Sequence, residues 1–333
     1  MQRVESVDCL KGLAILCITL LHFESGLISD SVNTWIGLFM ITAFYFASGW
    51  LSGIKGSNIA PKELFFKRLR QLGIPYLWFS LAILLFDLIW CICGFMEYKI
   101  FFRDIYKTLV LRGIGTLWFL PVLLFGEWLF CFVKSKKHCF AWGAGLFLLS
   151  FAASYFYYKF LPVRENSELM KLLEAPIRPV VYSLQAWPVV LFGFLGGRYL
   201  YPRMENCRKI YSLCWGIALL AISYLLVQFN INLYFISTWM INVFSALGFL
   251  LVFSVFPSNP VSDFFAYWGK NSLILMCIHF SILLEIMMTI DKSFLHHASF
   301  TGSRTLVYFA MTVAITWLLV PLFNNKLKFM LGK

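Results

Sequence analysis

Ionisable side chains within long apolar stretches are the residues of this chain best suited to do chemistry, because a polar group inside a membrane span is costly unless it is paired or lines a cavity. His22 lies eleven residues after Lys11. Eleven helical steps of about 100° return to nearly the same face and rise about 16 Å, so Asp8, Lys11 and His22 share one face. Histidine is the usual general base near neutral pH, so His22 could take a proton from a hydroxyl nucleophile. Asp8, one turn before Lys11, is the expected ion-pair partner of that lysine.

A second group of candidates is a basic cluster just before the third apolar stretch. Lys67, Arg68 and Arg70 place three cations within four residues. Forked guanidinium contacts and an ammonium point charge suit phosphate groups, so the cluster could hold the phosphates of a nucleotide-bearing donor. The alternative is a topology anchor, in which these cations only keep their loop on the cytoplasmic side.

Weaker candidates for a substrate site lie within or beside apolar stretches: Trp118, Glu127, Asn271 and His279. His279 follows Asn271 by eight residues, about 12 Å along a helix, so its depth is comparable to that of His22 and the two could share a cavity. For each buried polar residue the alternative is a hydrogen bond between helices that fixes their packing. Asp87 and Glu285 are assigned this structural role.

The composition indicates that the candidate residues lie on, or beside, transmembrane helices. Of the 333 residues, 60% are hydrophobic and 13% are charged, against about 45–50% and about 25% in soluble domains. These values exclude a large soluble catalytic domain and a disordered chain. Apolar runs long enough to span a membrane recur at about residues 12–29, 35–54, 74–95, 114–133, 139–158, 180–200, 210–229, 233–256, 272–290 and 305–323. We therefore expect an all-α membrane protein, a bundle of about ten transmembrane helices that forms a single domain over residues 1–333.

The net charge of +12 has a topological explanation. If both termini are cytoplasmic, most of the 28 Lys and Arg residues fall in the inner loops, as the positive-inside rule requires. The sequence therefore predicts cytoplasmic termini in a multi-pass protein of the plasma membrane, with no nucleic-acid partner. The cysteines and histidines show no metal-binding spacing, so no metal is expected.

Several blocks of the sequence resemble the integral-membrane acyltransferase-3 family over nearly the whole chain. The interval from Lys11 to His22 resembles that between a basic residue and a histidine in the N-terminal signature of the family. Lys11 stands where many members have Arg, and Gln71 occupies a place that is often basic. The further matching blocks are Ser48-Gly49, Lys67-Arg68 through Pro75-Tyr76, Trp118 through Pro121, the Gly-rich residues 192–198, and Gly269 through His279.

The resemblance implies an acyl-CoA-dependent O-acyltransferase. Such an enzyme transfers an acyl group, often acetyl, from cytoplasmic acyl-CoA to a hydroxyl of a sugar or glycan at the outer face of a bacterial membrane. It also implies that His22 and Lys11 are functional and that the basic cluster binds coenzyme A. We expect the thioester arm of coenzyme A to reach inward past Lys11 and Ser48. The expected partners are thus acyl-CoA, a glycan acceptor that is free or lipid-linked, and membrane lipid.

Two other functions remain open from the sequence. A polytopic transporter or flippase for a polysaccharide precursor could use buried carboxylates at Asp87, Glu127 and Glu285. The face that runs from Asp8 to His22 and the lack of a visible internal repeat favour the enzyme. A membrane glycosyltransferase with a lipid-linked donor would need an acidic pair in an outer loop, for which Glu165 and Glu168 are present.

Overall fold

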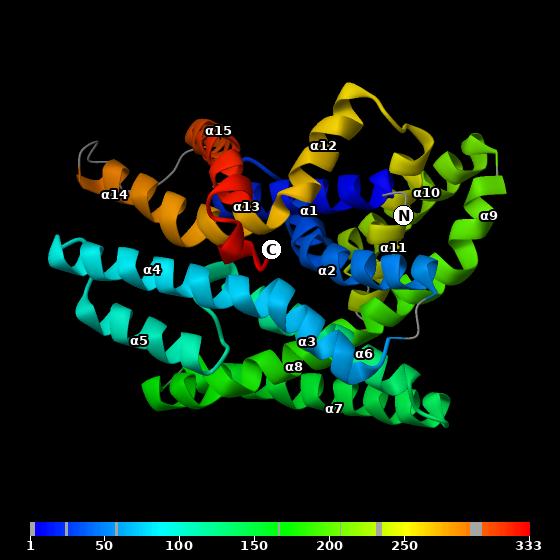
Figure 1. The fold of residues 1–333 in the computed structure, drawn as a ribbon, viewed down its shortest axis with the longest axis horizontal. Coiled ribbons are helices and arrows are strands. Elements are labelled where there is room, and N and C mark those ends of the chain that lie inside the picture. The colour runs from blue at the N-terminus through cyan, green and yellow to red at the C-terminus, as the bar shows by residue number, and fades with distance from the viewer. Residues whose placement is uncertain are drawn as a thin grey trace. The chain divides into compact units, whose positions relative to one another are not determined.

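The computed structural model describes residues 4–23, 26–56, 59–165, 167–206, 208–230, 235–293 and 302–333. Of the described residues, 88% are helical and none lies in a strand (Figure 1). Within this described part, ten helical stretches are long and apolar enough to cross a membrane. Because hydrocarbon offers no hydrogen-bond partner, a helix that satisfies its own backbone is the structure such stretches must adopt. The predicted all-α membrane bundle is confirmed.

The helices follow one another along the chain with short connections. The α-helices are α1 (Glu5–Phe23), α2 (Asp30–Lys55), α3 (Pro61–Arg68), α4 (Ile74–Ile92), α5 (Tyr98–Leu109), α6 (Phe119–Lys134), α7 (Cys139–Glu165), α8 (Glu168–Leu195), α9 (Tyr201–Asn206), α10 (Lys209–Gln228), α11 (Phe235–Val255), α12 (Pro260–Lys270), α13 (Ser272–Ile278), α14 (Glu285–Ser293) and α15 (Gly302–Asn325). Two 3₁₀ turns are η2 (Gly115–Trp118) and η5 (Lys328–Leu331). The described residues also contain three π-helical segments, η1 (Leu69–Gly73), η3 (Gly196–Leu200) and η4 (His279–Leu284).

The chain forms two compact units, each assembled from several stretches of sequence. The first unit contains residues 1–58, 187–273 and 300–309, and the second contains residues 59–186, 274–299 and 310–333. Helix α8 therefore contributes its first part to the second unit and its last part to the first.

In the first unit, α1 packs against α2, α11 and α12, and α10 packs against α11. The contact between α1 and α12 brings the two backbones together. A Cβ atom at Gly12 would overlap the carbonyl oxygen of Phe265, and one at Gly269 would overlap the carbonyl oxygen of Asp8. Small residues at these two positions thus fix Asp8, and the start of α1, against α12.

Glycines also join α2 to the last part of α8 within the first unit. A Cβ atom at Gly49 would overlap the carbonyl oxygen of Val190, and one at Gly193 would overlap that of Phe46. The Ser48-Gly49 block and the Gly-rich block, far apart in sequence, therefore pack backbone to backbone.

In the second unit, α3 continues through η1 into α4, so the basic cluster expected in a loop lies on a helix. Residues 159–179, which lie between the apolar runs 139–158 and 180–200, are likewise mostly helical, because α7 extends to Glu165 and α8 begins at Glu168. The first span, expected over residues 12–29, begins at Glu5 and ends at Phe23. Hydropathy marks only the apolar part of each helix, whereas backbone hydrogen bonding continues through its polar ends.

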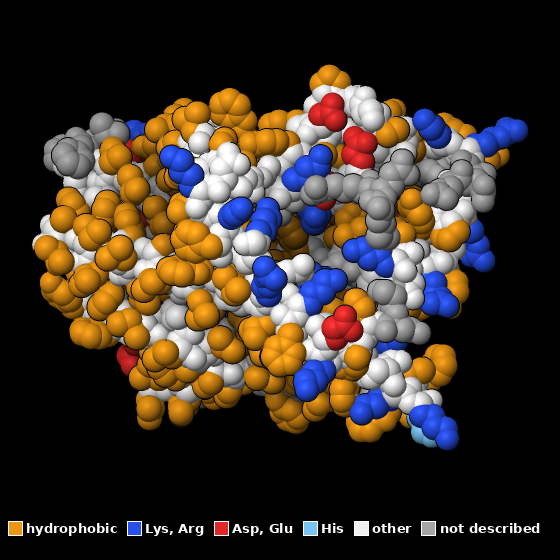
Figure 2. Space-filling model, viewed as in Figure 1, with side chains coloured by type: hydrophobic (Ala, Val, Ile, Leu, Met, Phe, Trp, Pro, Cys, Tyr) orange, Lys and Arg blue, Asp and Glu red, His pale blue; other side chains and the backbone are white. Residues whose placement is uncertain are grey.

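The surface exposes more apolar side chains than is usual for a protein in water. Large side chains such as Leu109, Phe140 and Phe156 are exposed, and apolar side chains cover wide areas of the face shown in Figure 2. A lipid environment accounts for such a surface, because contiguous exposed apolar patches are rare in soluble monomers.

Candidate active site

Helix α1 carries the three residues that the sequence places on one face. The Lys11 Nζ atom lies 2.9 Å from the Asp8 Oδ1 atom. Asp8 is 4% exposed, so its carboxylate depends on this cation to offset the loss of water. The helix is continuous from Glu5 to Phe23, which keeps His22 on the same face about 16 Å further along the axis. The ion pair expected from the spacing is present, while the catalytic role of these residues stays a prediction.

His22 lies in the last turn of α1 and is half-buried. The residue after it is held by a second helix of the first unit, because the Thr305 Oγ1 atom of α15 donates a hydrogen bond of 2.7 Å to the Phe23 carbonyl oxygen. Thr305 and Phe23 are both fully buried. The end of α1, and with it the imidazole of His22, is therefore held by α15.

Ser48 and Asn271 lie on helices that pack directly against α1. Ser48 is half-buried in α2, immediately before the close contact of Gly49. Asn271 is 9% exposed at the end of α12, where its Nδ2 atom donates a hydrogen bond of 2.9 Å to the Tyr267 carbonyl oxygen. The first unit thus holds all five of its predicted site residues on α1, α2 and the end of α12.

The basic cluster lies in the second unit, and its three cations have different surroundings. Arg68 forms an ion pair with Glu127 of α6, and its Nη1 atom donates a hydrogen bond of 2.8 Å to Gln71. Glu127 is 4% exposed, so this arginine neutralises a buried carboxylate. Lys67 and Arg70 are exposed. The cluster therefore consists of one cation built into the fold and two that face outward.

The C-terminal segment packs against the part of the chain that carries Arg70, a contact that the sequence does not predict. Gly332 has a φ of +67°, and a Cβ atom there would overlap the carbonyl oxygen of Arg70. The Phe329 and Trp78 rings, 5.1 Å apart, join η5 to α4. Three exposed lysines lie near this contact: Lys326, Lys328 and Lys333. The sequence shows these lysines close together, but from the sequence they indicate only that the C-terminus is cytoplasmic.

Trp118 and His279 lie on neighbouring segments of the second unit. His279 is fully buried at the start of η4. Its Nδ1 atom lies 2.8 Å from the Leu275 carbonyl oxygen, and because a carbonyl only accepts, Nδ1 must carry the proton. Thr116 of η2 donates a 2.6 Å hydrogen bond to the Met276 carbonyl oxygen, so η2 packs on this part of the chain. His279 and His22 belong to different units, and their shared cavity stays a prediction.

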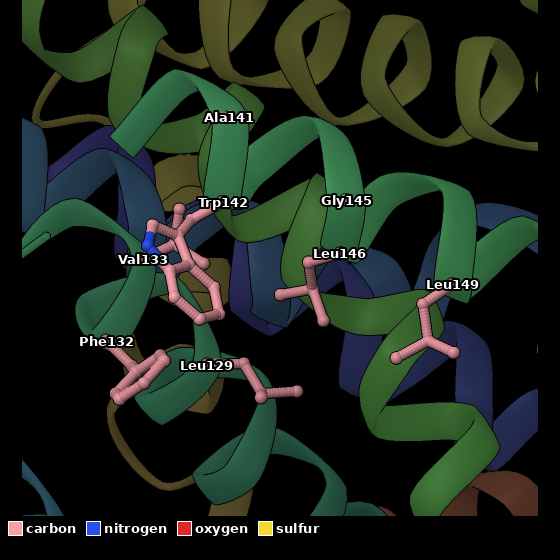
Figure 3. Close-up of a pocket in the computed structure, with 8 residues that line it drawn as sticks. All are labelled: Leu129, Phe132, Val133, Ala141, Trp142, Gly145, Leu146 and Leu149. Atoms are coloured by element: carbon pink, nitrogen blue, oxygen red, sulfur yellow. The ribbon is translucent and has the colours of Figure 1, made fainter. Parts of the chain in front are cut away.

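An apolar cavity of about 410 Å³ lies between α6 and α7 (Figure 3). Its lining consists of Leu129, Phe132, Val133, Ala141, Trp142, Gly145, Leu146 and Leu149. None of the predicted site residues lines it, and its side chains offer no acid, base or nucleophile. It is therefore suited to apolar groups rather than to the chemistry considered for His22.

Comparison with known proteins gives one family match. The family model described as an acyltransferase domain, that of the acyltransferase-3 family, matches residues 4–321. No curated protein and no solved structure matches the chain at a significant level. The match spans nearly the whole chain, from the start of α1 into α15. The chain therefore belongs to the acyltransferase-3 family, and it is a multi-pass membrane protein with acyltransferase activity.

Proposed function

We propose that this acyltransferase moves an acyl group, with acetyl the expected one, from cytoplasmic acyl-CoA to a hydroxyl of a sugar or glycan acceptor at the outer face of the plasma membrane. The observation that carries the proposal is the ion pair between the buried Asp8 and the half-buried Lys11, on the helix face that ends at His22. A cation at one end of a helix and an imidazole about 16 Å along it suit a reaction that begins with a cytoplasmic donor. Membership of an acyltransferase family favours this function over a transporter or a glycosyltransferase.

In this proposal the donor is held by cations. Lys67 and Arg70 contact the phosphates of coenzyme A, because both are exposed and free of a buried carboxylate partner among the ion pairs of the described residues. Arg68 contributes mainly by supporting the helix that carries them. Lys11 and Ser48 lie beside the thioester, where the ammonium group stabilises negative charge on the carbonyl oxygen.

The transfer itself uses His22. As a general base, His22 takes the proton of the acceptor hydroxyl while the oxygen forms a bond to the acyl carbon. The carbon–sulfur bond then breaks, and coenzyme A leaves as a thiolate that takes up a proton. In the second route the His22 nitrogen attacks the thioester carbon, the carbon–sulfur bond breaks, and coenzyme A leaves as a thiolate that takes up the imidazole proton. The acceptor oxygen then attacks the acyl carbon, the carbon–nitrogen bond breaks, and the imidazole takes up the hydroxyl proton.

The test is acetyl transfer from acetyl-CoA to surface glycan in membranes that carry His22→Ala. We expect the rate to fall by about 100-fold or more, since general acid–base catalysis contributes about 10²–10⁴-fold. His138→Ala is the matched control, because His138 is exposed and lies outside the predicted site. Activity of His22→Ala near that of the control would overturn the mechanism.

The two routes differ in one intermediate. After a short exposure of the wild-type protein to radiolabelled acetyl-CoA without acceptor, an acyl-histidine would retain label that hydroxylamine releases. Direct transfer leaves the protein unlabelled.

A further inference from the structure

Arg112 pairs with a buried carboxylate in the second unit, and Arg178 lies close to this pair. Glu174 is 2% exposed, and its Oε2 atom lies 3.6 Å from the Arg112 Nε atom. The Tyr157 hydroxyl donates a hydrogen bond to its other oxygen. Arg178 follows one turn later on α8, on the same face as Glu174. The cluster therefore joins the connection after α5 to the first turns of α8 and to α7.

Aromatic rings hold Arg178 without removing its charge. The guanidinium carbon lies 4.8 Å from the centroid of the Tyr182 ring and 5.8 Å from that of Trp118. The two rings are 5.2 Å apart and nearly perpendicular. Such cation–π contacts attract a guanidinium but leave its positive charge in place. Trp118, which the sequence predicts to line a substrate site, thus contacts the guanidinium of Arg178.

Among the described side chains, the cluster of Arg112, Arg178 and Glu174 carries one more positive charge than negative charge. The Glu174 carboxylate pairs with Arg112, and in the part of the chain that the structure describes the Nε atoms of both arginines are buried without a hydrogen-bond partner. Burial lowers the pKa of Arg112, and the charge of Arg178 lowers it further. A largely buried positive charge that lacks a counter-charge is costly, and an anionic group in contact with the two guanidiniums would remove that cost.

We propose that Arg112 and Arg178 bind an oxyanion carried by the sugar acceptor, so that this protein acts on an acidic rather than a neutral glycan. The inference rests on the proposed function. A guanidinium fork matches the two oxygens of a carboxylate or a phosphate, so the acceptor bears one of these groups. In the predicted topology, Arg112 and the start of α8 face outside, where that acceptor is expected.

The first experiment measures binding to the purified full chain in detergent at fixed ionic strength. The probes are a trisaccharide of galacturonic acid, the same trisaccharide with its carboxyl groups reduced to alcohols, and galactose 1-phosphate. We expect Kd at least tenfold lower for one of the two anionic probes than for the reduced trisaccharide, and the better probe identifies carboxylate or phosphate as the ligand group. Equal affinity for all three probes would overturn the inference.

Variants of opposite sign separate binding from a structural role. Arg178→Gln and Arg112→Gln should raise Kd for the preferred anionic probe at least tenfold, whereas Glu174→Gln should lower it, because the amide no longer competes for Arg112. Lys171→Gln is the control, since Lys171 is exposed and pairs with Glu168 at 2.8 Å, and its Kd should stay within twofold of the wild type. If the arginine variants do not fold, Arg178→Lys, which keeps the charge but loses the fork, and Glu174→Gln still decide the matter.

Failure of this inference is distinguishable from failure of the proposed function. Acyl transfer to acidic and neutral glycans with equal KM would contradict the anionic acceptor and leave the transferase proposal intact. Preferred binding of an anionic probe by wild-type protein that transfers no acyl group to any glycan would contradict the transferase proposal while supporting the anion site. His22→Ala should keep the anionic-probe affinity in either case.

Discussion

Asp8 and Glu127 are buried carboxylates, and each pairs with a cation that the sequence singles out. Asp8 pairs with Lys11 on its own helix, which the spacing along α1 predicts. Glu127 pairs with Arg68, a residue remote in sequence on another helix. The first pairing follows from helical periodicity, whereas the second depends on how α3 and α6 pack.

The different surroundings of Arg68 and Arg70 predict different effects of removing their charges. Arg68→Gln leaves the Glu127 carboxylate buried without its cation, so we expect the free energy of unfolding to fall by about 3 kcal/mol. Arg70→Gln should raise KM for acetyl-CoA about tenfold with little change in kcat or stability, as expected for loss of a phosphate contact. Thermal unfolding in detergent and steady-state kinetics measure the two effects.

The control for this pair is Lys62→Gln, because Lys62 is an exposed cation on α3. It should change neither quantity. An unchanged KM in Arg70→Gln would return the cluster to the role of a topology anchor.

The three π-helical segments coincide with blocks that the sequence singles out. Segment η1 contains Arg70, η3 contains Gly196 and Gly197, and η4 begins at His279. A π-helical turn inserts an extra residue into a helix and turns the following side chains, and such turns occur often at functional sites. The residue types pointed to these segments, but periodicity alone could not reveal a departure from 3.6 residues per turn.

Close contact between α1 and α12 gives a prediction at the scale of elements. A methyl group in Gly269→Ala would overlap the Asp8 carbonyl oxygen, so α1 and α12 must separate and the Asp8–Lys11 pair must shift. We expect unfolding free energy to fall by about 1–3 kcal/mol, the usual cost of overpacking, together with a loss of transfer activity. Thermal unfolding and the acetyl-transfer assay check this.

Gly37→Ala is the matched control in the same unit. Gly37 lies inside α2, and a Cβ atom there would meet nothing within 4 Å. Since alanine favours a helix over glycine by about 1 kcal/mol, this variant should be as stable as the wild type or more stable. Equal effects of the two substitutions would show that the close approach at Gly269 is unimportant.

Orientation in the membrane is a property of the whole molecule, and the distribution of Lys and Arg predicts cytoplasmic termini. In that orientation Cys93, which is exposed at the end of α4, faces outside. Cys139 at the start of α7 faces the cytoplasm. A membrane-impermeant maleimide should therefore label Cys93 in intact cells, and Cys93→Ser should remove that label. Labelling of Cys93 only after permeabilisation would reverse the orientation.

The helical membrane class and the face of α1 that joins Asp8, Lys11 and His22 are readable from the residues alone, because they depend on composition and on residues a few turns apart, which hydropathy and the period of the helix report directly. The family is recognisable from the resemblance of motif blocks along nearly the whole chain. Helix ends are harder to predict from the sequence, because the polar residues that continue a helix have the same hydropathy as polar residues in a loop. This is why the basic cluster was expected in a loop.

Contacts between residues far apart in the chain follow only from how the helices pack. This packing pairs Arg68 with Glu127, places Gly269 against Asp8 and gathers Arg112, Glu174 and Arg178 into one cluster. From the sequence, Arg68 is a candidate phosphate contact and Arg112 and Arg178 contribute only to topology, since each cation could pair with any acid at similar depth. The rotation and register of packed helices select one partner, and among the described side chains this leaves the cluster of Arg112, Arg178 and Glu174 with an excess positive charge.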